Sequence, residues 1–262
     1  MRVISVNLTP NYRKNHLKSN LSDVNQGQVV KLIQLLNDGS YNAVMKYFLF
    51  GRSQNGLAID AISFGSTGKH VLILGGVHGD EIEGVALVKF LVAELSENLD
   101  FPLKVTLVPC LNIDGFLAGT RQNANNVDLN RNLPTDDWNP TAFNDRYSPG
   151  DMANSELENK ALVEFIKTQR IDFILSLHSF SRSLLNVNGN CEPVSGLISD
   201  LTGLPVEESI GYPTPGCLGT YAGLERNIPT ITYELPRGSD ICEIIKLHGK
   251  SIKEALKVYA SC

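Results

Sequence analysis

The sequence contains no Cys-x-x-Cys pair, a single tryptophan and no cluster of Lys and Arg. Its apolar runs are all far shorter than the roughly 18 residues of a membrane span, so we expect no membrane partner. The 23 Lys+Arg are outnumbered by 28 Asp+Glu, which gives a formal net charge of −5 and predicts no nucleic-acid partner. The odd number of scattered cysteines disfavours a disulfide framework or a cysteine metal site at Cys110, Cys191, Cys217, Cys242 and Cys262.

The first residues also lack the apolar block of a signal peptide, because the chain becomes polar and basic over 11–18. We therefore expect a cytoplasmic protein. The 42% hydrophobic and 19% charged content is typical of a globular chain, and 262 residues fit one large domain or two small ones. We predict an N-terminal segment (1–50) packed on a main domain (51–262). The oligomeric state stays open.

Short apolar runs at 70–74, 105–108, 173–178 and 230–235 predict buried strands. Helical spacing of apolar residues lies between them, at 84–97 and after residue 155, and again at 240–259. Strands that alternate with helices indicate an α/β fold with a largely parallel sheet between helix layers. Ligands of such sheets bind at the carboxyl ends of the strands.

Two local signals predict turns and helix starts. The pair Asn55-Gly56 lies between two apolar runs and predicts a β-hairpin. The pattern Ser155-x-x-Glu158 predicts a capping box that opens a helix.

A first candidate site follows the strand at 70–74, in the segment Gly76-Val77-His78-Gly79-Asp80-Glu81. His78 and Glu81, three residues apart across a glycine turn, have the spacing to converge on one cation. The alternative is that Glu81 only stabilises the positive end of the following helix. The position at a strand end makes the two interpretations about equal on these residues alone.

His178 ends the predicted strand at 173–178 and is the candidate third ligand. Two imidazoles and one carboxylate with an open position form a ligand set of hydrolytic zinc. A lone histidine there would more often be a structural polar group. The remaining histidines do not end strands, and we interpret them as structural or solvated: His16, His70 and His248.

Glu234 ends the strand at 230–235 and is the candidate general base, which hydrolysis by zinc requires. A carboxylate in so apolar a run is unfavourable unless it lies at the exposed end or is paired. The alternative is a salt bridge to a nearby arginine.

The segment 119–134 is rich in polar residues, with Arg121, Asn130 and Arg131 as candidates. Arginine offers a planar set of donors for a carboxylate or an oxyanion. On its own, this segment favours an ordinary polar loop.

Together, these motifs resemble the zinc carboxypeptidase family, the M14-type metallopeptidases, from about residue 51 to 236. The matching stretches are His78-Gly79-Asp80-Glu81, Asp128-Leu129-Asn130-Arg131-Asn132, Leu177-His178-Ser179 and Thr232-Tyr233-Glu234. The resemblance implies a single-domain α/β/α sandwich with a mixed, largely parallel twisted sheet. It also implies one Zn²⁺ ion per chain and assigns the roles as follows: ligands His78, Glu81 and His178, general base Glu234, carbonyl-polarising Arg121, and carboxylate-binding Asn130 and Arg131.

Within the family, the sequence most resembles bacterial murein peptide amidases, which cut the γ-D-glutamyl–meso-diaminopimelate bond of cell-wall peptides during recycling. The supporting stretches are 127–134 and the Gly/Pro-rich loop 211–216, in which Tyr212 is the candidate for a substrate-binding tyrosine. The partner is then a small murein peptide, whose side chain would be lined by Asn186, Asn188 and Thr214.

Two rival functions stay open. The first is a deacylase of N-acyl amino acids, because succinylglutamate desuccinylases and aspartoacylases share the ligand set and a similar Asn-Arg segment. The second is a non-catalytic binding protein. The full ligand set together with Glu234 argues against the second rival.

Overall fold

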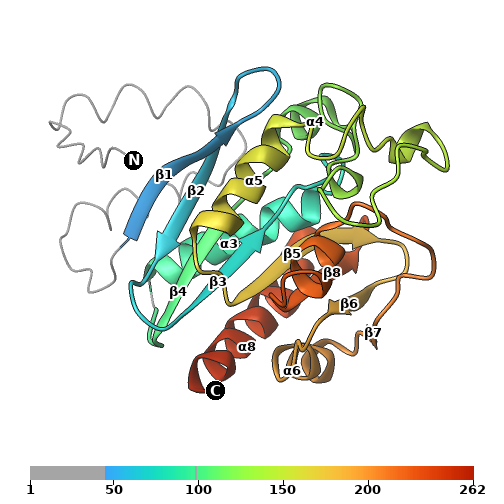
Figure 1. Cartoon of the computed structure of the whole chain (residues 1–262). Helices are drawn as coiled ribbons and strands as arrows, with labels where there is room; N and C mark the ends of the chain where they lie inside the picture. Colours follow the sequence, from blue (N-terminus) through green and yellow to red (C-terminus); the bar gives the residue numbers. More distant parts are fainter. Residues whose placement is uncertain (1–44, 98) are drawn as a thin grey trace, which may run out of the picture. The chain divides into compact units, whose positions relative to one another are not determined.

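The computed structural model of the chain describes residues 45–97 and 99–262 (Figure 1). The described residues belong to one compact unit, Ala43–Cys262. Residues 1–44, with His16 and most of the predicted N-terminal segment, lie outside the described residues.

One eight-stranded sheet runs through the unit in the order β1-β2-β4-β3-β5-β8-β6-β7. The four inner strands β4, β3, β5 and β8 are parallel, whereas β1, β2 and β4 pair antiparallel and so do β8 and β6. The first strand contains the predicted boundary after residue 50. The strands are β1 (Met45–Arg52), β2 (Ala58–Phe64), β3 (Lys69–Leu74), β4 (Leu103–Val108), β5 (Phe173–Phe180), β6 (Leu184–Asn188), β7 (Val206–Glu207) and β8 (Thr230–Pro236).

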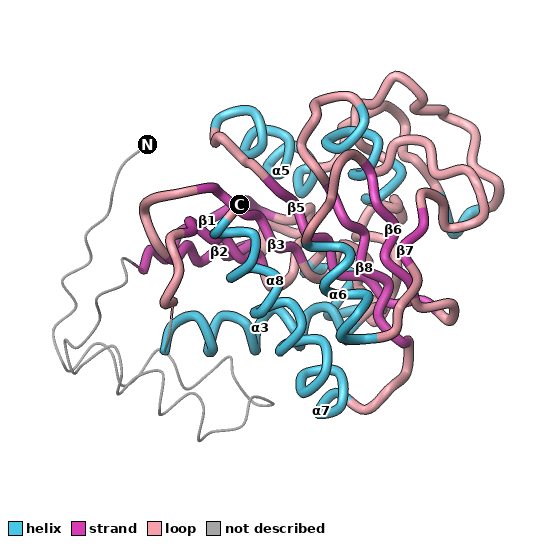
Figure 2. The backbone as a smooth tube through the Cα atoms, turned by 90° about the horizontal axis from the view of Figure 1, so that it is seen from below, coloured by secondary structure: helices cyan, strands magenta, loops and turns pink. Residues whose placement is uncertain are grey.

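Helices cover both faces of this sheet. On one face, Val71 and Ile73 of β3 join a core with α3 (Ile82–Glu97), α6 (Val194–Thr202) and α8 (Lys250–Ser261). On the other face, Leu72 and Leu74 pack in a second core with α5 (Leu157–Thr168) and the π-helical turn η3 (Gly219–Leu224). Figure 2 shows α5 on one side of the strands and α3 on the other. The predicted α/β/α sandwich with a mixed, largely parallel sheet is confirmed.

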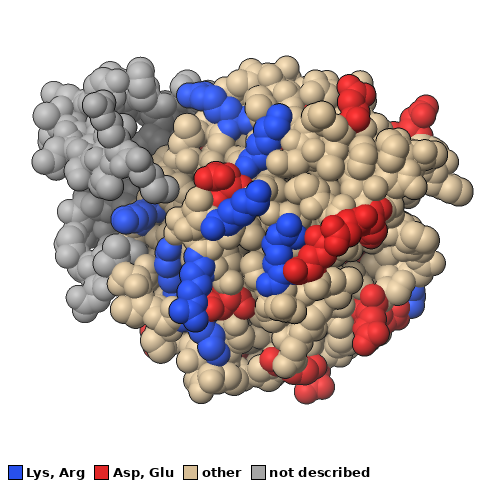
Figure 3. Space-filling model, in the orientation of Figure 1, with Lys and Arg blue, Asp and Glu red and all other residues tan. Residues whose placement is uncertain are grey.

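Short helices complete the chain. The predicted C-terminal helix is a continuous helical segment of α7 (Ile241–Ile244), η4 (Ile245–Gly249) and α8, while α4 (Ile113–Ala118) follows β4. No helix in the described part of the chain is long and apolar enough to cross a membrane. On the face shown in Figure 3, Lys and Arg side chains stand singly or in short groups, with acidic side chains between them.

The two local signals had different outcomes. The hairpin is confirmed, since β1 and β2 pair antiparallel around a turn in which Gly56 has φ 80°. The capping box is wrong, because α5 begins at Leu157 without a side-chain cap. The Ser155 hydroxyl donates to Glu156 Oε1 at 2.6 Å, and Glu158 instead accepts the backbone N–H of Gln54 at 3.2 Å.

The parallel inner strands bring distant residues to one edge of the sheet. His78 follows the end of β3, while His178 and Glu234 lie near the carboxyl ends of β5 and β8. In the register of β5 and β8, His178 is directly paired with Glu234. The carboxyl ends of three strands therefore build the floor of one site, as expected for a parallel sheet.

Candidate active site

Three ligand atoms converge at this edge of the sheet. His78 Nδ1 lies 2.9 Å from Glu81 Oε1, and His178 Nδ1 lies 3.0 Å from Glu81 Oε2 and 3.1 Å from His78 Nδ1. The three side chains are buried, with at most 3% of each residue exposed. Within the described ranges, they form the one group of three His, Cys, Asp or Glu residues with the spacing to hold a metal ion.

A glycine makes the close turn between His78 and Glu81 possible. A Cβ on Gly79 would lie 2.0 Å from the backbone carbon of Gly115, at the start of α4. Because backbone atoms cannot yield at that distance, a larger residue would move the turn and both ligands. Glu81 directly precedes α3, so the expected glycine turn and the convergence of the two side chains are both present.

Each histidine has a second partner behind the site. His78 Nε2 lies 3.1 Å from Asp128 Oδ1, and His178 Nε2 lies 3.0 Å from Ser176 Oγ. Ligating histidines usually have such an outer partner, which fixes the tautomer and leaves the other ring nitrogen for the metal. This donor set therefore fits a divalent cation such as zinc. Asp128 and Ser176 escaped the sequence reasoning, although Asp128 lies in the motif that contains Asn130.

The charges near the ligands offset the effect of burial on the pKa values of His78 and Glu81. Burial and Arg121 lower the pKa of His78, but Glu81 and Asp128 together hold this pKa above its ordinary value. Burial raises the pKa of Glu81, yet the charges and hydrogen bonds of the two histidines hold it well below its usual range. The Glu81 carboxyl is thus ionised at neutral pH, as metal binding requires.

Glu234 faces this group from β8. The residue is 8% exposed, and its carboxyl group has no hydrogen bond or ion pair among the described residues. Within the described part of the chain, Glu234 therefore does not form the alternative salt bridge to an arginine. Burial raises the pKa of Glu234, and the nearby Glu81 adds to this effect, while His178, Arg121 and Arg131 oppose it. An unpaired buried carboxylate beside a candidate metal site has the properties of a general base.

The three polar candidates of the loop 119–134 also line the pocket. The Arg121 guanidinium donates to Asp128 Oδ2 at 3.0 Å and lies 3.3 Å from Glu81 Oε1. Arg131 donates to the Asn130 carbonyl at 2.7 Å and has no carboxylate partner among the described residues. Asn130 Oδ1 accepts the Leu218 N–H at 2.9 Å, so its amide donors stay free for another ligand.

Other predicted residues divide into lining and non-lining positions. Tyr212 lines the pocket at 39% exposure, 6.3 Å between ring centroids from Tyr147, and burial raises its pKa. Asn186 and Thr214 line the pocket, whereas Asn188 is not among its lining residues.

His70 bonds Thr106 Oγ1 at 2.8 Å and His248 bonds the Tyr233 hydroxyl at 2.6 Å, so both are structural. All five cysteines are free.

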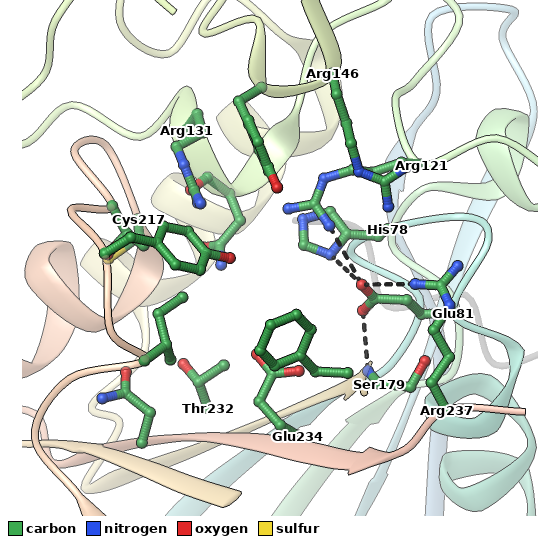
Figure 4. Close-up of a pocket in the computed structure, with 17 residues that line it drawn as sticks. His78, Glu81, Arg121, Arg131, Arg146, Ser179, Cys217, Thr232, Glu234 and Arg237 are labelled. Carbon is green, nitrogen blue, oxygen red and sulfur yellow. Dashed lines mark hydrogen bonds and ion pairs between the residues drawn. The ribbon is translucent and has the colours of Figure 1, made fainter. Parts of the chain in front are cut away.

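The close-up in Figure 4 shows two sides of this pocket. Arg131, Cys217 and Thr232 lie on one side, and Glu81, Arg146 and Arg237 on the other, with Glu234 between them. Sequence reasoning missed Arg146 because its loop has no pattern. A weak signal existed for Arg237, which comes three residues after Glu234.

Comparisons with known proteins agree with this geometry. Residues 30–202 match the zinc carboxypeptidase family. A murein peptide amidase A of Vibrio campbellii is 34% identical over 63% of this chain and 68% of the relative, and that of Escherichia coli K12 is 31% identical over 63% and 70%. The structure of the murein-tripeptide amidase from Escherichia coli O157 is similar with a TM-score of 0.67 and 27% identity, covering 80% of this chain and 91% of that one.

More distant structures share only the fold. A succinylglutamate desuccinylase of Silicibacter aligns with a TM-score of 0.55 at 18% identity, covering 82% of this chain and 66% of that one. The family match covers more than half of the chain, and the murein peptide amidase relatives are at least 30% identical over two thirds of their length. The chain is therefore a hydrolase that belongs to the zinc carboxypeptidase family.

Proposed function

We propose that this chain binds one zinc ion through His78, Glu81 and His178 and hydrolyses an amide bond next to a free carboxylate. The observation that carries the proposal is the convergence of these three ligand atoms beside the unpaired carboxyl of Glu234. The outer partners Asp128 and Ser176 support the ligand set. When bound, zinc supplies Lewis acidity and lowers the pKa of water to about 7.

Glu234 is the proposed proton carrier. Its carboxylate accepts the proton of the attacking water and later delivers this proton to the leaving amine. The raised pKa suits both tasks, because a more basic carboxylate takes the proton more readily and still returns it to an amine. No other carboxyl group lining the pocket lacks an ion-pair partner within the described ranges.

Arg121 is the proposed group that polarises the scissile carbonyl. A guanidinium has five N–H donors. In Arg121, Nε and Nη2 contact Asp128, and Nη1 contacts Glu81. The remaining donors are free for the carbonyl oxygen and for the negative charge that develops on it. The fixed pairing with Asp128 holds this cation in place before the substrate arrives.

Asn130 and Arg131 are proposed to bind the carboxylate of the leaving residue. Arg131 is the arginine of the pocket without a carboxylate partner in the described part of the chain, and the Asn130 amide donors are free. Binding a carboxylate there positions the adjacent amide bond for attack. Tyr212 lines the same pocket and is proposed to donate a hydrogen bond to the bound peptide.

The proposed substrate is a small murein peptide, cut at the γ-D-glutamyl–meso-diaminopimelate bond. The murein peptide amidases among the relatives support this choice. The pocket wall beside Arg131 adds a chemical argument, since Asn186, Thr214 and Thr232 are polar and uncharged. The far end of diaminopimelate carries both an amine and a carboxylate, so its net charge of zero suits an uncharged polar wall.

The test is hydrolysis of L-Ala-γ-D-Glu-meso-diaminopimelate by zinc-loaded protein, with N-acetyl-aspartate and N-succinyl-glutamate in parallel. Release of diaminopimelate that a chelator abolishes and zinc restores is the expected result. Cleavage of an acyl amino acid alone would overturn the murein substrate and assign the chain to the deacylases. Absence of cleavage of all three substrates with zinc bound would overturn the proposed amidase.

A further inference from the structure

Two arginines that the proposed mechanism does not use meet at one carboxylate beside the pocket. Arg237, just after β8, donates through Nη2 to Asp80 Oδ2 at 2.6 Å. Arg146, in the short helix η2 (Asp145–Tyr147), places Nη2 3.6 Å from the same oxygen. Both arginines line the pocket, and Asp80 belongs to the turn between His78 and Glu81.

Arg146 and Arg237 are the more exposed cations on this side of the pocket. Arg121 is matched by the buried Asp128, and Glu81 is already engaged by two histidines and Arg121. Arg237 Nη1 lies 3.8 Å from Glu81, at the limit of an ion pair. Both guanidinium groups contact the one carboxylate of Asp80, and the buried Glu83, which accepts the Gly238 N–H at 2.6 Å, adds its negative charge near Arg237. Because both arginines line the pocket and are partly exposed, N–H donors remain on them for a ligand.

A purely structural role explains this arrangement poorly. The side chains of Arg146 and Arg237 are 50% and 35% exposed, and ion pairs with that exposure contribute little to stability. A neighbouring polar group also awaits a partner: Ser179 is 2% exposed, lines the same pocket, and its hydroxyl has no hydrogen bond among the described residues.

The direction of the substrate follows from the opposite wall. Arg131 lies on one side of Glu234, and Arg146 and Arg237 lie on the other (Figure 4). If Asn130 and Arg131 bind the carboxylate of the leaving residue, the acyl residue therefore lies on the side of Arg146 and Arg237. In a γ-glutamyl amide, the acyl residue carries a free α-carboxylate two methylene groups away from the scissile carbonyl. In an α-linked peptide, this carboxyl group is itself the scissile carbonyl, so no backbone carboxylate remains on the acyl side.

We propose that Arg146 and Arg237 bind the free α-carboxylate of the γ-linked acyl residue and thereby select γ-glutamyl amides over ordinary α-peptides. This inference rests on the proposed amidase function and adds a specificity site to it. Asp80 holds the Arg237 cation in place. The more exposed Arg146, in η2, contacts the α-carboxylate of the substrate. The Ser179 hydroxyl is the nearest uncharged donor for the same residue.

The test compares two substrates that differ at one group: the tripeptide with a free D-glutamate α-carboxylate and the same tripeptide with this carboxylate amidated. The wild-type protein is expected to prefer the free acid by about tenfold to a hundredfold in kcat/KM, the range for a charge-assisted hydrogen bond. Arg237→Gln and Arg146→Gln are expected to lose this preference by weakening cleavage of the free acid. Cleavage of the amidated peptide should change little.

The matched control is Arg170→Gln. Arg170 is also paired with an aspartate at 3.6 Å, but it lies before β5, at the opposite end of the sheet from the site. This variant should keep the preference of the wild type. Arg237→Lys and Arg146→Lys should restore part of it, because a cation returns without the planar geometry of arginine.

A binding measurement separates recognition from turnover. Calorimetry with the Glu234→Gln variant should show weaker binding of the amidated tripeptide than of the free acid, and Arg237→Gln in this background should remove the difference. If both tripeptides are cut or bound equally by the wild type, or if the arginine variants weaken both equally, the specificity site is refuted while the amidase stands. If neither tripeptide is cut, the proposed function itself has failed.

Discussion

The candidate site combines two kinds of structure that hold their residues in different ways. His178 and Glu234 are placed by the hydrogen-bonded register of β5 and β8, within the buried sheet. Arg121 and Arg131 come from the irregular segment before α5. In this segment, hydrogen bonds of buried Asn and Asp side chains hold the backbone in place of strand pairing. The comparison teaches that the reacting groups are held by the core of the fold, whereas the substrate-binding groups depend on a network of polar side chains.

The largest effect should come from the strand side, with Glu234→Gln. The amide keeps the shape of the side chain but cannot take a proton, so turnover should fall by about 10²–10⁴-fold. Zinc content should stay unchanged, because Glu234 is not a proposed ligand. Activity assays and metal analysis measure the two quantities. The partly exposed Glu254→Gln on α8 is the control, and near-normal turnover of Glu234→Gln would refute its role as the base.

On the loop side, Asn132→Ala should lower stability by about 2–3 kcal/mol. Asn132 is fully buried, and its Nδ2 donates to the Pro149 carbonyl at 2.7 Å and the Met152 carbonyl at 2.9 Å, so it ties the two halves of the segment together. Urea unfolding measures the loss. The exposed Asn139→Ala is the control, since its Oδ1 accepts only the neighbouring Thr141 N–H. An unchanged midpoint in Asn132→Ala would show that the network is dispensable.

Asp128→Asn tests the point where the two regions meet, because Asp128 of the loop bonds His78 and Arg121. Loss of its charge should weaken zinc binding by about 10–100-fold, as is usual for the outer partner of a histidine ligand. Competition with a chromogenic chelator measures the affinity.

Asp114→Asn provides the control for Asp128→Asn. This second buried carboxylate bonds the Ser53 hydroxyl at 2.8 Å in the hairpin turn, and its loss should reduce stability without affecting zinc affinity. Equal zinc affinities in Asp128→Asn and the wild type would mean that the strand side needs no support from the loop.

The same division explains what the sequence could predict. His78, His178 and Glu234 stand at the ends of apolar runs, so their meeting follows from the geometry of parallel strands. The roles of Arg121, Asn130 and Arg131 came only from the family resemblance, since a polar loop has no period that specifies direction. Arg146 and Arg237 converge on Asp80 through long-range packing. The failed capping box has two causes, because the Ser155 hydroxyl bonds the adjacent Glu156 and Glu158 bonds the distant Gln54.

The smallest predicted effect concerns the end of the sheet opposite the site. His70 is the second residue of β3, is buried and bonds Thr106. Burial, with a contribution from Lys104, lowers its pKa to about 4, against the opposing effects of Arg170 and Asp172. Because this pKa is below the value of about 6.5 in the unfolded chain, unfolding takes up a proton between these values. Stability is therefore complete above about pH 6.5 and falls as the pH drops toward 4. The expected His70 contribution is about 1 kcal/mol between pH 7.5 and 5.5.

The measurement must separate His70 from the histidines of the site, which also titrate. Urea unfolding of metal-free protein at pH 7.5 and 5.5 is therefore compared between the wild type and His70→Gln, in which the amide keeps a hydrogen bond to Thr106 but does not titrate. The site histidines contribute equally to both proteins, so the difference between the two pH dependences belongs to His70. The variant should lose about 1 kcal/mol less on acidification. An identical loss in both proteins would mean that His70 takes up its proton in the folded state, and that this end of the sheet is more open to water than its burial indicates.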